Sequence, residues 1–498
     1  MTDLGHFIAG ETVSGERTIE VLNPATAEPV RRLAMADTAT VQRAIDAARE
    51  AQPAWRDMPP AKRAQVMYRF KTLLERDADE ICALISEEHG KVLEDAMGEL
   101  KRGIENVEYA CGVPELLKGE YSHNAGPGID TWSNHQPLGI VAGITPFNFP
   151  AMVPLWMYPM ALACGNAFIL KPSEQAPSAA VKMAELLDEA GLPRGLFSVV
   201  HGDREAVDAL IEAPEVRALS FVGSTPVARK IYEGGTQQGK RVQALGGAKN
   251  HAVVLPDADI DNAASTLIGA AYGSAGERCM AISVAVCVGD ATADALVERL
   301  AAQARELKIG PGTEKGLDMG ALINAGQRDK VAGYIEQGAA AGAELVVDGR
   351  QHPLVESSPG YFLGATLFDR VTPEMSIYSD EIFGPVLCVV RVETFEEAIA
   401  LINAHQYGNG TCVFTRDGEA GRRFADAIEV GMVGINVPLP VPVAYHSFGG
   451  WKRSLFGDLH AYGPDSVRFY TRRKAVSQRW PSAFETTQAE FNFPSGGH

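Results

Sequence analysis

The sequence is short of positive charge. It has 45 Lys and Arg against 63 Asp and Glu, a formal net charge of −18. Nucleic acids and anionic membranes bind proteins through basic patches, so we expect neither as a partner. The longest apolar region, residues 151–170, is interrupted by prolines and by Gly165-Asn166, which predicts a buried helix and no membrane span. Residues 1–6 lack the basic start and apolar core of a secretion signal.

Paired cysteine spacings are also missing. The cysteines are odd in number and scattered, and they are Cys82, Cys111, Cys164, Cys279, Cys287, Cys388 and Cys412. This pattern excludes a zinc cluster of the usual kind and gives no disulfide framework, so we expect no metal site and a reducing, cytoplasmic location.

The two commonest nucleotide motifs are absent too: no strand is followed by Gly-x-Gly-x-x-Gly, and no Gly-Lys-Ser/Thr loop occurs. Two weaker signals are present. Residues 220–226 form a strand that ends in Gly223-Ser224 before a helix, which leaves backbone N–H groups free for a phosphate. Lys171 and Glu174 follow another strand, where they could hold the hydroxyls of a ribose; a carboxylate there favours NAD over NADP. Either stretch alone could be an ordinary capped or solvated turn.

Strand and helix patterns alternate along most of the chain. A length of 498 residues exceeds what one core usually serves. The alternation over residues 139–255, repeated after residue 279 and closing with the strand-like stretch 467–471, predicts mostly parallel sheets covered by helices. Residues 119–137 break the helical period and suggest a strand outside the main sheet that bridges subunits. We therefore expect two α/β domains with a cleft between them.

One thiol has a setting suited to chemistry. Cys279 lies in the small-residue turn 273–283, between an apolar helical run and a β-branched strand, with Arg278 beside it. Such a cysteine can be exposed and tuned toward the thiolate that attacks carbonyl carbon. Taken alone, the turn fits a buried cysteine that fills space better than it fits a catalytic one.

Five motifs in order give the chain a resemblance to the aldehyde dehydrogenase superfamily. They are Thr145-Pro146-Phe147-Asn148-Phe149-Pro150, Lys171-Pro172-Ser173-Glu174, Phe221-Val222-Gly223-Ser224, Gly276-Glu277-Arg278-Cys279 and Glu381-Ile382-Phe383-Gly384-Pro385. The resemblance implies the fold of that family: a Rossmann-like NAD-binding domain (1–118 and 138–246), an α/β catalytic domain (247–462) and small oligomerisation segments (119–137 and 463–490). It also implies a homodimer or homotetramer.

The resemblance assigns roles to the motif residues. Cys279 would attack the aldehyde, and the Asn148 side chain with the Cys279 backbone N–H would stabilise the alkoxide while hydride leaves for NAD. Phe147, Lys171, Glu174, Gly223, Ser224, Glu381 and Phe383 would bind the cofactor.

The hydrolytic members carry a Glu that activates water, and this sequence lacks it. The corresponding position falls on Leu245, with a one-residue ambiguity, and both choices are apolar. Loss of that base suits an enzyme that passes its acyl group to coenzyme A, because a thiol supplies its own thiolate.

Gly247-Ala248-Lys249-Asn250-His251 and the Cys279 loop resemble the methylmalonate-semialdehyde dehydrogenases. That likeness implies oxidation and decarboxylation of malonate or methylmalonate semialdehyde to acetyl-CoA or propionyl-CoA. Arg278 and Arg102 match the two arginines that would bind the substrate carboxylate. The alternatives are a hydrolytic enzyme, a different semialdehyde, or a non-catalytic binding relative.

Overall fold

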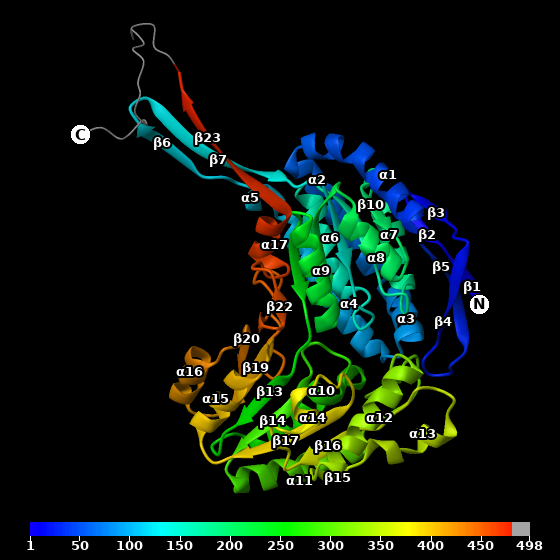
Figure 1. Ribbon diagram of the computed structural model, residues 1–498, viewed down its shortest axis with the longest axis vertical. Coiled ribbons are helices and arrows are strands. Elements are labelled where there is room, and N and C mark those ends of the chain that lie inside the picture. The colour runs from blue at the N-terminus through cyan, green and yellow to red at the C-terminus, as the bar shows by residue number, and fades with distance from the viewer. Residues whose placement is uncertain (481–498) are drawn as a thin grey trace.

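The computed structural model describes residues 1–480 as two α/β lobes and a projecting three-stranded arm (Figure 1). The chain starts in the upper lobe, passes into the lower lobe after β12 and returns through α17 (Gly463–Tyr470) to the arm. Among the described residues, no helix is both long and apolar enough to cross a bilayer.

The upper lobe is built on an eight-stranded sheet. In sheet order its strands are β22 (Leu455–Phe456), β12 (Arg241–Leu245), β11 (Val216–Val222), β8 (Ile140–Ile144), β9 (Ala167–Lys171), β10 (Phe197–Val199), β2 (His6–Ile8) and β3 (Glu11–Val13). The strands from β12 to β10 run parallel. Every residue of β8 and β9 is buried, as expected for parallel strands with both faces covered.

Helices α1 to α9 accompany this sheet. They are α1 (Thr38–Asp57), α2 (Pro60–Arg76), α3 (Ala78–His89), α4 (Leu93–Cys111), α5 (Val113–Leu116), α6 (Met152–Ala163), α7 (Ser178–Glu189), α8 (Arg204–Glu212) and α9 (Thr225–Gln237). Helices α2 and α3 are separated only by Asp77, which ends α2 and precedes α3. Helix α6 is buried along its whole length, in agreement with the expectation of a buried helix over this apolar region.

The lower lobe has a seven-stranded sheet. Its order is β15 (Glu344–Val347), β16 (Thr366–Asp369), β17 (Val386–Val392), β14 (Ile282–Val288), β13 (Asn250–Val254), β19 (Gly410–Phe414) and β20 (Met432–Ile435), and only the edge strand β15 runs antiparallel. The helices of this lobe are α10 (Ile260–Tyr272), α11 (Asp290–Glu306), α12 (Ala325–Ala340), α13 (Pro353–Ser357), α14 (Ser376–Ser379), α15 (Phe395–Ala404) and α16 (Gly418–Ala427).

The arm is an antiparallel sheet that extends away from both lobes (Figure 1). Its strands are β6 (Tyr121–Gly126), β7 (Ile129–Pro137) and β23 (Thr471–Arg479). Two smaller sheets complete the fold, one of β1 (Thr2–Leu4), β5 (Pro29–Met35) and β4 (Arg17–Leu22), the other of β18 (Tyr407–Gly408) and β21 (Trp451–Lys452).

The structure corrects some expected elements. The expected strand-like stretch 467–471 is mostly helix α17, because Pro464 opens a helical turn and Val467, Phe469 and Tyr470 are buried on its inner face; β23 begins only at Thr471. Strands β12 and β16 were not expected. Of the segment 463–490, residues 481–490 lie outside the described residues. The division into domains stays a prediction. Strand β22 lies within the residues expected to form the catalytic domain, and it pairs with β12 of the upper sheet.

Candidate active site

The two sheets contribute opposite strand ends to the site. In the upper lobe, Thr145, Lys171 and Gly223 stand at the carboxyl ends of β8, β9 and β11, where parallel sheets bind ligands. In the lower lobe, Cys279 and Glu381 stand before the amino ends of β14 and β17. The site is therefore assembled from loops that two rigid sheets hold in place.

The turn that carries Cys279 has an unusual backbone. We call residues 273–280 the nucleophile loop. Ser274, Ala275 and Gly276 all have positive φ angles, of 52°, 52° and 72°. A Cβ added at Gly276 would lie 2.2 Å from the carbonyl oxygen of Gly384, so only glycine fits there. Backbone of this kind persists only where the surroundings hold it.

Side chains from distant parts of the chain hold the loop. Asn250 donates to the carbonyl oxygens of Cys279 and Ala281, at 2.9 Å each, and Asn409 donates to the Cys279 carbonyl at 3.1 Å. Asp95 accepts a hydrogen bond from the Ser274 backbone N–H at 3.0 Å. The loop is thus fixed on several sides, and the Cys279 thiol remains partly exposed.

Asn148 reaches the same loop from the other lobe. Its buried side chain donates from Nδ2 to the Glu277 carbonyl oxygen at 3.0 Å. An amide nitrogen carries two protons, so one N–H of Asn148 is left to meet an oxyanion on a substrate bound to Cys279.

Cys279 lies where two cavities meet. One, which we call the inner cavity, has a volume of about 210 Å³ and is lined by Phe147, Asn148, Gly223, Ser224, Gly246, Glu381 and Phe383 among others. The second, the arginine cavity, measures about 260 Å³ and is lined by Arg102, Arg278, Asp95, Phe149, Trp156 and Phe448 among others. Cys279 lines both cavities, so one thiol can face two different ligands.

A third cavity continues from the inner one. This outer cavity, of about 540 Å³, shares Phe147, Gly223 and Ser224 with the inner cavity, and Lys171 and Glu174 line it further out. Lys171 Nζ lies 3.1 Å from a Glu174 carboxylate oxygen. All seven residues expected to bind the cofactor therefore line two connected cavities.

The lining fits NAD. The Glu174 carboxylate favours ribose hydroxyls and opposes a 2′-phosphate. Ser224 lies at the N-terminus of α9 without a side-chain capping bond, so the N–H groups of the first turn remain available to a diphosphate. In the inner cavity, the Phe383 ring packs edge-on against Phe147, with 6.0 Å between ring centroids, and these rings offer apolar contact for a nicotinamide.

The expected arginines are brought together, but neither is free of protein partners. Arg278 forms an ion pair with Asp95 and donates to the Gly269 carbonyl at 3.4 Å. Arg102 lies 2.7 Å from the Glu105 carboxylate and donates to the carbonyl of Pro442 at 2.7 Å. A carboxylated substrate would therefore share these guanidinium groups with acidic neighbours.

The electrostatics of Cys279 contradict one expectation. Burial, with a smaller contribution from the Glu381 carboxylate, raises the pKa of this thiol to about 12, and the lowering by Arg278 does not offset the rise. In the protein without ligands the thiol is therefore protonated, and the expected tuning toward thiolate by Arg278 is wrong for this state. Burial also raises the pKa of Glu381 to about 6, against a hydrogen bond from the Ala248 backbone N–H of 2.9 Å that lowers it.

The two positions expected for the missing base lie on β12. Leu245 is buried at the end of β12, paired with Leu455, and the alternative position, Ala244, is buried beside it in the same strand. Neither has a proton acceptor in its side chain. The carboxylate that does line the inner cavity is Glu381, which packs against Gly247, where a Cβ would lie 2.4 Å from Glu381 Oε2.

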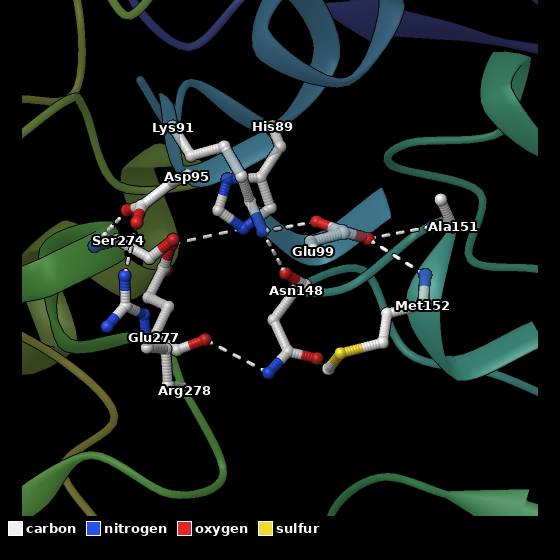
Figure 2. Close-up of polar contacts among 10 residues, drawn as sticks. All are labelled: His89, Lys91, Asp95, Glu99, Asn148, Ala151, Met152, Ser274, Glu277 and Arg278. Atoms are coloured by element: carbon white, nitrogen blue, oxygen red, sulfur yellow. Dashed lines mark hydrogen bonds and ion pairs between the residues drawn. The ribbon is translucent and has the colours of Figure 1, made fainter. Parts of the chain in front are cut away.

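A group of buried polar residues behind the nucleophile loop was not foreseen (Figure 2). Lys91 and Glu99 form a fully buried ion pair, and His89 Nε2 lies 3.9 Å from Glu277 Oε2. Burial lowers the pKa of His89 and raises the pKa of Glu277, so both are neutral. His89, Lys91 and Glu99 come from α3, the turn after it and α4, and no motif in the sequence marks them.

Comparison with known proteins identifies the family. The model of the aldehyde dehydrogenase family matches residues 11–476. The chain belongs to this family. The expected superfamily and fold are thereby confirmed, and with them the aldehyde dehydrogenase class of enzyme.

Several relatives of this aldehyde dehydrogenase bear more specific names. The malonate-semialdehyde dehydrogenase of Pseudomonas aeruginosa is 69% identical, over 99% of this chain and 100% of the relative. The crystal structure of a methylmalonate-semialdehyde dehydrogenase from Oceanimonas doudoroffii is 64% identical and superposes with a TM-score of 0.96, covering 97% of this chain and 99% of that one. A putative methylmalonate-semialdehyde dehydrogenase from Sinorhizobium meliloti, complexed with NAD, is 52% identical with a TM-score of 0.96 over the same shares.

Proposed function

We propose that this aldehyde dehydrogenase oxidises malonate or methylmalonate semialdehyde with NAD, releases the carboxylate as CO₂ and transfers the acyl group to coenzyme A. The observation that carries the proposal is the position of Cys279 between a cavity with two arginines and a cavity with the cofactor residues. The names and high identity of the relatives support the substrate class.

The first half of the reaction makes a thioester. The Cys279 thiol gives its proton to water and its sulfur bonds to the aldehyde carbon, while the aldehyde oxygen gains the electron pair of the C=O bond. The Asn148 amide and the Cys279 backbone N–H stabilise that oxyanion, each donor being worth about 3 kcal/mol. NAD, when bound, would accept the hydride that leaves this carbon, and Phe147, Phe383 and Glu381 would hold it. An acyl group bound to sulfur remains.

The second half removes the carboxylate and the acyl group. The bond between the carboxylate and the neighbouring carbon breaks, its electrons pass toward the thioester carbonyl beside Asn148, and that carbon then takes up a proton as CO₂ leaves. The coenzyme A thiolate attacks the thioester, and Cys279 leaves as thiolate. Because neither Leu245 nor Ala244 offers a base, water has no proton acceptor at this position.

The experiment is a substrate panel with product identification. Malonate, methylmalonate and succinate semialdehydes and propanal are each incubated with NAD, with and without coenzyme A. We expect acetyl-CoA or propionyl-CoA with equal amounts of CO₂ and NADH. Turnover indifferent to coenzyme A would overturn the acylating reaction, and a preference for succinate semialdehyde would overturn the substrate.

A hydrolytic enzyme is the second candidate, and Glu381 is the observation that favours it. Its carboxylate lines the inner cavity with Cys279 and has a pKa raised to about 6, which suits a general base. Free acid as the main product, lost in Glu381→Gln while NADH is still formed in one turnover, would support this alternative. The hydrogen bond from Ala248 to Glu381 favours a fixed cofactor-binding role instead.

Assembly and location remain part of the proposal. The arm presents β6 and β23 as sheet edges away from both lobes, which suits pairing with a second copy and therefore a homodimer or homotetramer (Figure 1). A variant lacking residues 121–137 should be smaller in light scattering than the full chain. The cytoplasm is the compartment in which NAD, coenzyme A and free thiols coexist, and all the cysteines here are free.

A further inference from the structure

The Lys91–Glu99 ion pair is the most deeply buried charged contact beside the site. The two side chains are 2.7 Å apart and both have zero exposure to solvent. A buried ion pair is weak evidence for stability, because desolvation can exceed the attraction between the charges. Its presence so close to the nucleophile loop therefore calls for another explanation.

Both partners bind the segment that carries Asn148. Lys91 Nζ donates to the Asn148 carbonyl oxygen at 2.6 Å. Glu99 Oε1 accepts from the backbone N–H groups of Ala151 and Met152, at 2.8 and 3.1 Å. The pair thus contacts both ends of the turn between β8 and α6, as Figure 2 shows.

Helix α6 has no cap of its own. Ala151, at its N-cap position, has no side chain that can accept a hydrogen bond, so Glu99 supplies the missing acceptor from α4. A carboxylate at the N-terminus of a helix is also favoured by the helix dipole. Glu99 therefore fixes the start of α6, and Lys91 fixes Asn148, three positions before the N-cap residue Ala151.

We propose that Lys91 and Glu99 are positioning residues that aim the Asn148 amide at the oxyanion. The inference rests on the proposed function, in which Asn148 is the oxyanion donor. The chain of contacts runs from Glu99 to Lys91, from Lys91 to the Asn148 carbonyl, and from Asn148 Nδ2 to the Glu277 carbonyl. When the Asn148 backbone shifts, its amide leaves the position that the oxyanion requires, whereas the backbone carbonyl of Cys279 is held separately by Asn250 and Asn409.

The test compares two reactions of the same thiol. Aldehyde oxidation develops an oxyanion, and alkylation of Cys279 by iodoacetamide does not. The variant is Lys91→Met/Glu99→Gln, in which neither charge is left unpaired and the glutamine can still accept from Ala151 and Met152. We expect NADH formation in a single turnover with malonate semialdehyde to slow roughly 30- to 100-fold, as small misplacements do. We expect the KM to change little and the alkylation rate to stay within about threefold of wild type.

Asn148→Ala provides the second arm. Relative to Asn148→Ala alone, adding Lys91→Met/Glu99→Gln should slow the single turnover by less than about threefold. The reason is that the Asn148 amide, which the pair positions, is already absent. A full further loss, a parallel fall in alkylation, or wild-type turnover in the folded variant would overturn the inference. If the double variant does not fold, Glu99→Gln alone is measured, and a loss below threefold in that variant also overturns it. A normal single turnover in Asn148→Ala would instead refute the role of Asn148 in the proposed function.

Discussion

Asp95 binds the guanidinium of Arg278 with one carboxylate oxygen and the Ser274 backbone N–H with the other. The two charged side chains, drawn in Figure 2, are both among the residues that line the arginine cavity with Cys279. Asp95 therefore holds the nucleophile loop, and it also competes for the cation that the substrate carboxylate needs.

Replacing Asp95 by Asn should strengthen the binding of carboxylated substrates. The amide oxygen can still accept from Ser274, but the negative charge beside Arg278 is gone. We expect the KM for malonate semialdehyde to fall about three- to tenfold, up to about 1.4 kcal/mol, while the KM for propanal changes little. Steady-state kinetics on both aldehydes checks this, and a higher KM for malonate semialdehyde alone would show that Asp95 mainly positions Arg278.

Replacing Arg278 by Leu should lower kcat/KM far more for carboxylated substrates than for propanal. A charge-assisted hydrogen bond is worth about 1.5–3 kcal/mol, so kcat/KM for malonate semialdehyde should fall roughly 10- to 100-fold. Arg278→Leu leaves Asp95 unpaired, so Arg278→Leu/Asp95→Asn is the matched control and should show the same selectivity. Equal losses on both aldehydes in the control would remove the carboxylate role of Arg278.

Glu277 should tolerate an uncharged replacement. Burial raises the pKa of its carboxyl well above the ordinary value, so the group is protonated and faces the neutral His89. Glu277→Gln should keep activity within about threefold and leave the pH profile unchanged, because an amide can replace a protonated carboxyl. Glu277→Ala opens a cavity under the loop and should lower the free energy of unfolding by roughly 1–3 kcal/mol. A large loss in Glu277→Gln would mean that the charged form matters.

The thiol of Cys279 should be slow to react in the absence of cofactor. With a pKa near 12, its thiolate fraction is small and rises tenfold per pH unit, so iodoacetamide alkylation should increase through pH 9 without a plateau. Above pH 6 the Glu381 carboxylate is charged and raises the thiol pKa, so Glu381→Gln should alkylate several-fold faster. A plateau near neutral pH in the cofactor-free enzyme would contradict this environment.

Local patterns were sufficient for most of the fold and for the residues in motifs. Strand β14 follows the nucleophile loop, where its β-branched run predicts it, and Cys279, Asn148 and Glu381 line one cavity, as the family resemblance implies. Those positions follow from the short-range periodicity of side chains and from motif order.

The residues that sequence analysis missed act across long distances in the chain. Lys91 and Glu99 read as ordinary charged positions of a helical region, because nothing local shows that both point inward and meet Asn148. Asp95 likewise pairs with Arg278, which lies 183 residues further along the chain. The thiol pKa was missed for a similar reason, since desolvation depends on the packed surroundings and an adjacent arginine does not outweigh it.

The central claim is that an acyl group on Cys279 waits for a second thiol. The most direct measurement mixes the enzyme with NAD and malonate semialdehyde in a stopped-flow instrument and adds coenzyme A after the first phase. The account predicts one NADH per Cys279, then near arrest, then renewed NADH and acetyl-CoA once coenzyme A is present. Steady NADH production before coenzyme A is added, with free acid as the product, would contradict it.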